Sequence, residues 1–324
     1  MALPDFFLVG APKAGTTALH AALVPHPGLY LSKVKEPKYF LCADEPPARP
    51  GQQGQRGPGD AHSAREWVWR RGDYEALFAD APAGALLGES TPFYLYDRGA
   101  QERLRAAVPD AKLIAVVRDP VDRAYSNWMH LWSDGLEPIG DFVQACRAED
   151  ARVADGWAPF WHYRRLGRYG EQLRHLYSLF PREQVLVLRY RQLVDEPQQT
   201  LDTVCSFLGV EHGHAVSAPP ENVRPFVPAT RRNLALAKLV RAGAAAGAYF
   251  PPRVWRAASV PLLRALHSRG TARPRLGVDQ RREVLAPLVD DIRELEELTG
   301  QSFADWLGDE GRGEFRARQR PASA

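Results

Sequence analysis

A short loop near the start of the chain carries residue types that can hold a phosphate. The loop Gly10-Ala-Pro-Lys13-Ala-Gly15-Thr16 follows an apolar run and leads into a helix-forming stretch. In such a strand–loop–helix unit, backbone N–H groups and the helix N-terminus collect an anionic phosphate. Gly10 and Gly15 have the spacing of the Walker motif G-x-x-x-x-G-K-[ST], but Thr16 stands where that motif has its lysine. Lys13 instead projects from the middle of the loop, where a single bridging oxygen is a suitable target. An ordinary strand-to-helix turn is the alternative.

A second segment can hold a separate phosphate. The apolar run 112–117 predicts a strand that delivers Arg118 at its carboxyl end, and Pro120 stands at the first turn of the helix that follows. Ser126 comes about two turns into that helix. A fixed guanidinium with a hydroxyl beside it makes a clamp for a phosphate. A structural salt bridge between Arg118 and a nearby carboxylate explains this segment equally well when it is taken alone.

Taken together, the two segments resemble the sulfotransferases that use 3′-phosphoadenosine 5′-phosphosulfate (PAPS). In that family, P-K-x-G-T-T after the first strand is the 5′-phosphosulfate loop, and R-D-P-x-x-R-x-x-S is the 3′-phosphate site. Both motifs occur here in the same order, at residues 12–17 and 118–126. The resemblance implies that PAPS is the cosubstrate. The residues that it assigns to PAPS from these motifs are Lys13, Ala14, Gly15, Thr16, Thr17, Arg118 and Ser126.

Further segments extend the resemblance over residues 5–307. Residues 34–40, which include Glu36, resemble the K-E-x-x-F-F segment of carbohydrate-type members, in which the glutamate is the catalytic base. Residues 88–94 resemble their G-E-K-T-P-x-Y segment, but Ser90 replaces the lysine and cannot supply a cation. Tyr190 is placed like a tyrosine that contacts adenine in relatives. Residues 268–273 resemble loosely the glycine-rich loop that closes over PAPS, which assigns Arg269 and Arg273 to the 3′-phosphate.

The resemblance implies a mechanism that these residue types support. Glu36 is the candidate general base for the attacking hydroxyl or amine of the acceptor. Lys13 neutralises the bridging oxygen as adenosine 3′,5′-bisphosphate leaves, while the loop N–H groups with Thr16 and Thr17 hold the 5′-phosphate. No metal is expected, because the sequence has no cluster of ligands. A solvated surface charge between two lysines is the alternative for Glu36. His20 shows no Ser or Cys partner at a meaningful spacing.

Three hypotheses for function follow. The first is a PAPS-dependent sulfotransferase that acts on a hydroxyl, less readily an amine, of a carbohydrate, glycolipid or secondary metabolite. The second is a P-loop kinase-like transferase, but no lysine follows Gly15, and Asp119 comes one residue late for a metal-binding aspartate after the strand. The third is a non-enzymatic protein that binds anionic lipid or polysaccharide, which leaves both phosphate motifs unexplained.

These motifs need a scaffold in which short buried strands alternate with helices. The runs 113–117 and 185–188 are continuously apolar, as in parallel strands covered on both faces. The alternation predicts an α/β fold, a P-loop-like open sheet of about five parallel strands flanked by helices. Ligands of such sheets gather at the carboxyl ends of strands, where Gly10, Glu89 and Arg118 fall. The expected strands are 6–10, 29–31, 86–88, 113–117 and 185–188, and the expected helices are 16–23, 100–107, 120–132, 168–179 and 198–208.

The remaining segments predict one domain with irregular parts. Residues 1–307 are expected to form a single sulfotransferase domain, with a flexible loop insertion at 44–72 and a disordered tail at 308–324. Residues 222–278 form a basic region, which holds eleven Lys or Arg residues and no Asp or Glu. Two short amphipathic helices, broken at Pro251-Pro252, are expected in this region. They fit a lid over the acceptor, a peripheral membrane contact or simple packing on the sheet.

The composition favours a soluble globular protein. The 324 residues are 45 % hydrophobic and 25 % charged, and the net charge of +3 is too small to indicate nucleic-acid binding. The charge therefore argues against a nucleic-acid partner, whereas the resemblance to sulfotransferases implies a small-molecule or glycan acceptor. Three separated cysteines indicate thiols rather than a disulfide framework. We expect a cytoplasmic location, because the sequence has neither a signal peptide nor an apolar run near the length of a membrane span. High Ala and Arg content suggests a bacterial source.

Overall fold

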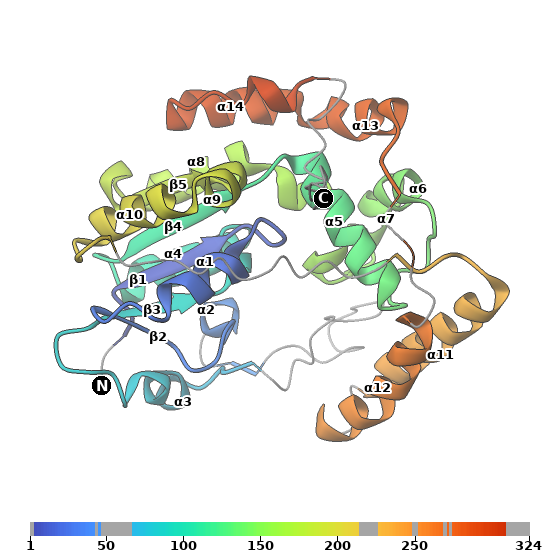
Figure 1. Cartoon of the computed structure of the whole chain (residues 1–324), viewed down its shortest axis with the longest axis horizontal. Coiled ribbons are helices and arrows are strands. Elements are labelled where there is room, and N and C mark those ends of the chain that lie inside the picture. The colour runs from blue at the N-terminus through green and yellow to red at the C-terminus, as the bar shows by residue number, and fades with distance from the viewer. Residues whose placement is uncertain are drawn as a thin grey trace, which may run out of the picture.

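The fold is built on a central sheet of five strands (Figure 1). The computed structural model describes residues 3–42, 45–46, 67–213, 226–247, 252–267, 271 and 274–308. Every strand pair is parallel, and the strand order is β2-β3-β1-β4-β5. The strands are β1 (Phe6–Gly10), β2 (Leu29–Leu31), β3 (Leu86–Ser90), β4 (Lys112–Val117) and β5 (Val185–Arg189). The predicted α/β fold with a parallel sheet is thus confirmed.

The apolar runs explain the strands. Every residue of β1 is buried, and β4 is buried after its first residue, as expected for strands covered on both faces. Close packing also fixes a glycine in β3, because a Cβ at Gly88 would lie 2.2 Å from the Phe6 ring. β1 and β2 have the predicted bounds. β3 is longer than predicted and includes Glu89 and Ser90, which the polar side chains did not suggest.

Two groups of helices cover the sheet. Helices α1 and α10 contact each other, and α4, α8 and α14 contact one another in turn (Figure 1). The five helices that the sequence predicted are present, each within two residues of the expected bounds. The helices are α1 (Thr16–Leu23), α2 (Tyr39–Cys42), α3 (Arg71–Glu75), α4 (Arg98–Ala107), α5 (Pro120–Ser133), α6 (Phe142–Arg147), α7 (Glu149–Ala154), α8 (Tyr169–Leu179), α9 (Tyr190–Asp195), α10 (Pro197–Leu208), α11 (Arg231–Gly247), α12 (Pro252–His267), α13 (Val278–Leu285) and α14 (Val289–Thr299).

The basic region contains a helical hairpin. Helices α11 and α12 pack side by side and project from the body at the lower right of Figure 1, away from the sheet. α11 ends at Gly247 and α12 begins at Pro252, and the predicted break between them falls on residues 248–251, which lie outside the described residues. The helices are longer than expected, with 17 and 16 residues. No helix within the described ranges is long and apolar enough to cross a membrane. The predicted loop 44–72 and tail 308–324 lie largely outside the described residues.

Candidate active site

The loop after β1 turns into α1 at Gly15. Gly15 has φ 90°, in the left-handed region, and is the N-cap of α1. A Cβ at this position would lie 2.8 Å from the Tyr190 ring, so the backbone conformation and the close contact both require glycine. Lys13 also has a positive φ, 67°, which is uncommon for a residue with a side chain. The start of α1 thus has three polar side chains near it, which are the half-buried Lys13, the buried Thr16 and the exposed Thr17.

Arg118 joins the ends of three neighbouring strands. Its side chain is only 6 % exposed and follows directly after β4. Its Nη1 donates to the carbonyl oxygen of Lys13 at 3.3 Å, and its Cζ lies 4.6 Å from the centroid of the Tyr190 ring. The structure therefore brings together Lys13, Gly15, Arg118 and Tyr190, as a shared phosphate site requires. Ser126 is half-buried on α5, about two turns beyond Arg118.

A histidine that sequence analysis did not single out lies beside Lys13. The Nζ of Lys13 is 3.4 Å from Nδ1 of His130 on α5. An ammonium group has no lone pair, so Nδ1 accepts this contact and the ring proton is on Nε2. That Nε2 lies 3.7 Å from Oδ2 of Asp134, whose Oδ1 lies 3.6 Å from Nε2 of His267 on α12. A continuous set of polar contacts therefore runs from the phosphate loop to the hairpin.

Asp119, next to Arg118, has a structural role. Its Oδ1 accepts from the N–H groups of Val121 and Asp122 and so caps α5. Arg281 on α13 donates from Nη1 to the same carboxylate at 3.2 Å, and both side chains are buried. A carboxylate with these partners is poorly placed to bind a metal ion through a kinase-type site, which weakens the kinase-like hypothesis.

Glu36 lies at the carboxyl end of β3. Its backbone N–H donates to the carbonyl oxygen of Ser90 at 3.0 Å, and its φ is 61°. Its carboxylate pairs with Lys35 at 2.5 Å, and only 24 % of the Glu36 side chain is exposed. The other flanking lysine, Lys38, is buried with its Nζ 4.9 Å from the centroid of the Trp67 ring. Glu36 is thus a half-buried charge at the edge where ligands are expected, and its role as the base stays a prediction.

His20 has a hydroxyl partner, so the expectation that it lacks one is wrong. Its Nδ1 lies 2.8 Å from Oγ of Ser90, which is 70 residues away in sequence. Burial lowers the pKa of His20 to about 4, Lys35 lowers it further and Glu36 acts in the opposite direction. His20 is therefore neutral at neutral pH. It does not replace the cation that is missing at Ser90.

Glu89 is a fully buried carboxyl group in β3. It accepts hydrogen bonds from the hydroxyl groups of Tyr74 at 2.7 Å, Thr91 at 2.5 Å and Tyr94 at 3.1 Å. Burial raises the pKa of Glu89 to about 7, although the three hydroxyl donors act in the opposite direction. The Tyr94 oxygen also accepts from the Phe40 N–H at 3.2 Å, so this network ties β3 to α2. The sequence placed Glu89 at a strand end but gave no sign of its burial.

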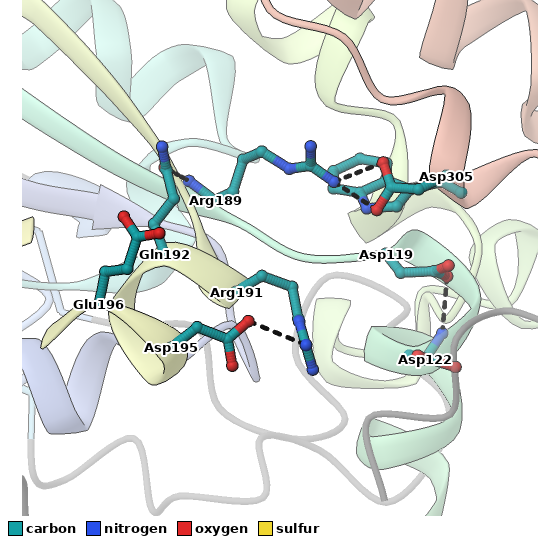
Figure 2. Close-up of a pocket in the computed structure, with 9 residues that line it drawn as sticks. Asp119, Asp122, Arg189, Arg191, Gln192, Asp195, Glu196 and Asp305 are labelled. Carbon is teal, nitrogen blue, oxygen red and sulfur yellow. Dashed lines mark hydrogen bonds and ion pairs between the residues drawn. The ribbon is translucent and has the colours of Figure 1, made fainter. Parts of the chain in front are cut away.

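A cavity of about 300 Å³ is lined by residues of α9, of the start of α5 and of the segment 305–306 (Figure 2). Within it, Arg189 points toward Asp305, and Arg191 points toward Asp195 at 2.9 Å. Five carboxylates and two guanidinium groups line the cavity, so its own charge does not favour a bisphosphate. The carboxylates of this cavity therefore argue against a phosphate-binding role for its lining. The lining residues are Asp119, Asp122, Arg189, Arg191, Gln192, Asp195, Glu196, Asp305 and Trp306.

Two predicted site residues cannot be placed. Arg269 and Arg273 lie outside the described residues. Among the residues that are described, no group of three or more His, Cys, Asp or Glu is arranged to hold a metal ion. The expectation that the reaction needs no metal stays a prediction.

Comparison with known proteins identifies the family. A model of the "Sulfotransferase family" matches residues 4–214. Human heparan sulfate glucosamine 3-O-sulfotransferase 6 is 29 % identical over 208 residues, which are 64 % of this chain and 53 % of the relative. Human bifunctional heparan sulfate N-deacetylase/N-sulfotransferase 3 is 30 % identical over 210 residues, which are 64 % of this chain and 22 % of the relative. The matched part thus spans about half, or less, of the length of these curated relatives.

A solved structure extends the likeness beyond the matched sequence. The crystal structure of a sulfotransferase from Alicyclobacillus acidocaldarius covers 95 % of this chain and is itself covered completely, with 28 % identity and a TM-score of 0.71. The family model accounts for the segments that carry Lys13, Arg118 and Tyr190, and the structural match includes the sheet that brings them together. The chain therefore belongs to the sulfotransferase family.

Proposed function

We propose that this sulfotransferase moves the sulfuryl group from PAPS to a hydroxyl group of a carbohydrate, glycolipid or secondary metabolite, with an amine as the less favoured acceptor. The observation that carries the proposal is the meeting of the Lys13 loop, Arg118 and Tyr190 at the carboxyl ends of β1, β4 and β5. A buried guanidinium next to a loop at a helix N-terminus suits a ligand with two separate phosphates.

The residues divide between the two ends of PAPS. The loop N–H groups of Ala14 and Gly15, together with Thr16 and Thr17, would hold the 5′-phosphate. Arg118 and Ser126 would hold the 3′-phosphate, and the Tyr190 ring would contact adenine. The buried position of Arg118 supports this assignment, because a phosphate bound there would be shielded from water and the charge pairing strengthened. Arg269 and Arg273 are retained as candidates for the 3′-phosphate on the resemblance of their loop alone.

The proposed transfer is an in-line displacement at sulfur. The carboxylate of Glu36 takes the proton of the acceptor hydroxyl group while the oxygen of that hydroxyl group forms the new O–S bond. The bond between sulfur and the bridging oxygen breaks, and adenosine 3′,5′-bisphosphate leaves with the electron pair. Lys13 stabilises the charge that develops on the bridging oxygen. Lys35 pairs with Glu36, so a positive charge lies directly beside the proposed base.

The named activities of the relatives support a glycan as the first acceptor to test. Both relatives described above act on heparan sulfate, one in O-sulfation and one in N-sulfation, so a hydroxyl and an amine both stay open. Radiolabelled PAPS should be offered with desulfated heparan oligosaccharides, glycolipids and phenolic metabolites. We expect transfer to a hydroxyl-bearing acceptor without added metal. A reaction that requires ATP and Mg²⁺ instead would contradict the proposal.

The role of Glu36 needs a matched control. Glu36→Gln keeps the size of the side chain and should abolish transfer while leaving the affinity for adenosine 3′,5′-bisphosphate unchanged. Glu183→Gln, at an exposed position before the amino end of β5 and so across the sheet from the carboxyl ends, should transfer as the unchanged protein does. Full activity of Glu36→Gln would show that another group accepts the proton.

A further inference from the structure

The α11–α12 hairpin is anchored to the body through one edge. The indole N–H of Trp132 donates to the Val227 carbonyl at 2.8 Å, and Arg241 donates to the Gly135 carbonyl at 2.9 Å. His267, the last residue of α12, lies 2.9 Å from the Ser133 carbonyl oxygen at the same open end of the hairpin as Val227. These contacts leave the opposite side of the hairpin directed away from the protein (Figure 1).

The outward side of α11 mixes basic and apolar residues. The buried stripe of this helix is made by Asn233, Ala237 and Val240, which are at most 7 % exposed. Leu234 and Leu239 lie off that stripe and are 39 % and 57 % exposed. The exposed basic residues of the same helix are Arg231, Arg232 and Lys238. On α12, Val260 is 40 % exposed, and Arg264 is exposed beyond it.

The charge of this region has one sign. Residues 222–278 hold eleven Lys or Arg residues and no acidic residue, whereas the whole chain has a net charge of only +3. Docking this side onto the same side of a second copy would bring like charges together, which argues against self-association. A soluble polyanion would use the basic residues but would gain nothing from large exposed leucines. An anionic lipid surface uses both, because lipid phosphates meet the cations and the acyl boundary receives the leucines.

We propose that the outward side of the α11–α12 hairpin docks the protein on an anionic membrane surface. The proposal does not depend on the transfer chemistry. The set of polar contacts from His267 through Asp134 and His130 to Lys13 places the active site on the body behind the hairpin. A docked protein would therefore keep its phosphate loop near the membrane without inserting it.

The test is co-sedimentation with vesicles. Vesicles of phosphatidylcholine alone should be compared with vesicles that also contain phosphatidylglycerol, at low and at high salt. We expect binding to the anionic vesicles only, with strong weakening at high salt. The double variant Leu234→Ser/Leu239→Ser and the double variant Arg231→Ser/Arg232→Ser should each weaken binding roughly tenfold.

Matched controls separate the hairpin from general surface properties. Val24→Ser removes an apolar side chain that is 54 % exposed but lies at the end of α1, and Arg293→Ser removes an exposed cation from α14. Both should bind vesicles as the unchanged protein does. All variants should keep their affinity for adenosine 3′,5′-bisphosphate and their melting temperature, which shows that they fold.

Three results would overturn the proposal. One is equal binding to neutral and anionic vesicles, or no binding to either. A second is loss of binding in the arginine variant with no change in the leucine variant, together with capture on heparin, because this side would then bind a soluble polyanion. The third is a dimer in light scattering that the leucine variant dissociates, because the leucines would then form an interface between two copies.

Discussion

The ammonium nitrogen of Lys13 lies 3.4 Å from Nδ1 of His130, although the two residues are 117 positions apart. The contact brings the phosphate loop after β1 against the second half of α5, the helix whose start follows Arg118. Lys13 is the residue to which we assign the bridging oxygen of PAPS. His130 is therefore in contact with the ammonium group that we assign to the reaction.

This arrangement predicts a change at His130 when PAPS binds. The bridging oxygen should draw the Lys13 ammonium away, so Nδ1 of His130 loses a donor and its ring signals shift. Nitrogen NMR of histidine-labelled protein, titrated with PAPS, measures this shift. Lys13→Met should show a shifted His130 signal before any ligand is added. His175, which contacts Gln101 on α4, is the internal control and should not move. If the His130 signals responded neither to PAPS nor to Lys13→Met, the contact between Lys13 and His130 would be contradicted.

Gly15 should be indispensable for binding the cosubstrate. Gly15→Ala puts a Cβ within 2.8 Å of the Tyr190 ring and strains a φ of 90°, so we expect the affinity for adenosine 3′,5′-bisphosphate to fall at least about tenfold. Gly84→Ala is the matched control, because Gly84 has φ 83° but no atom within 4 Å of the added Cβ. It should cost about 1 kcal/mol of stability and leave the affinity unchanged. If Gly15→Ala and Gly84→Ala bound adenosine 3′,5′-bisphosphate equally well, the packing of Tyr190 against Gly15 would not matter for binding.

Glu89 should make folding depend on pH. Its pKa is raised from the ordinary 4.5 to about 7, so the folded state holds a proton that the unfolded state has already lost in this range. Stability should therefore fall as the pH rises from about 4.5 to about 7, by about 3 kcal/mol, and change little from this source above that range. Urea unfolding at a series of pH values should show that Glu89→Gln lacks this decline.

The comparison with the variant is essential, because other groups act in the opposite direction. Burial lowers the pKa of His20 and of His162 to about 4, which makes the folded state less stable as the pH falls through their range. Only the difference between the unchanged protein and Glu89→Gln isolates the carboxyl group. If the difference in the free energy of unfolding between the two proteins did not change with pH, Glu89 would be ionised in the folded state at pH 5.

The ion pair between Arg281 and Asp119 should be a large contributor to stability. Arg281→Ala would remove the guanidinium that pairs with the buried Asp119 carboxylate, whose side chain is only 6 % exposed, and we expect a loss of about 3 kcal/mol or more in the free energy of unfolding. The neighbouring Arg282 is exposed, and its ion pair with the almost fully exposed Asp279 is 3.7 Å long, so Arg282→Ala should change stability by less than about 0.5 kcal/mol. Similar losses in the two variants would contradict a structural role for Asp119.

Local patterns were sufficient to predict the sheet and which residues lie at the ends of its strands. Continuous apolar runs ended by glycine or charge marked the strands, and neighbouring parallel strands then bring Lys13 and Arg118 to one edge of the sheet. The same patterns could not reveal which side chains meet across the fold. The His20–Ser90 hydrogen bond and the Lys13–His130 contact join residues that are far apart in sequence.

The sequence also could not reveal how deeply individual side chains are buried. Glu89 stands in a motif that was recognised, together with its partners Thr91 and Tyr94. Its protonation also depends on the Tyr74 hydroxyl group from α3 and on complete exclusion from water. The position of the hairpin could not be predicted either. Its amphipathic pattern predicted two helices correctly, whereas its projection from the body depends on contacts such as that of Trp132 with Val227.

Calorimetric titration with adenosine 3′,5′-bisphosphate is the most direct test of the central claim, that Lys13, Gly15, Arg118 and Tyr190 form a PAPS site. The unchanged protein and Arg118→Ala should be titrated without metal, with ATP and Mg²⁺ as the comparison. Binding in the micromolar range that is lost in the variant and much weaker for ATP would support the account. A preference for ATP with Mg²⁺, or bisphosphate binding that survives Arg118→Ala, would contradict it.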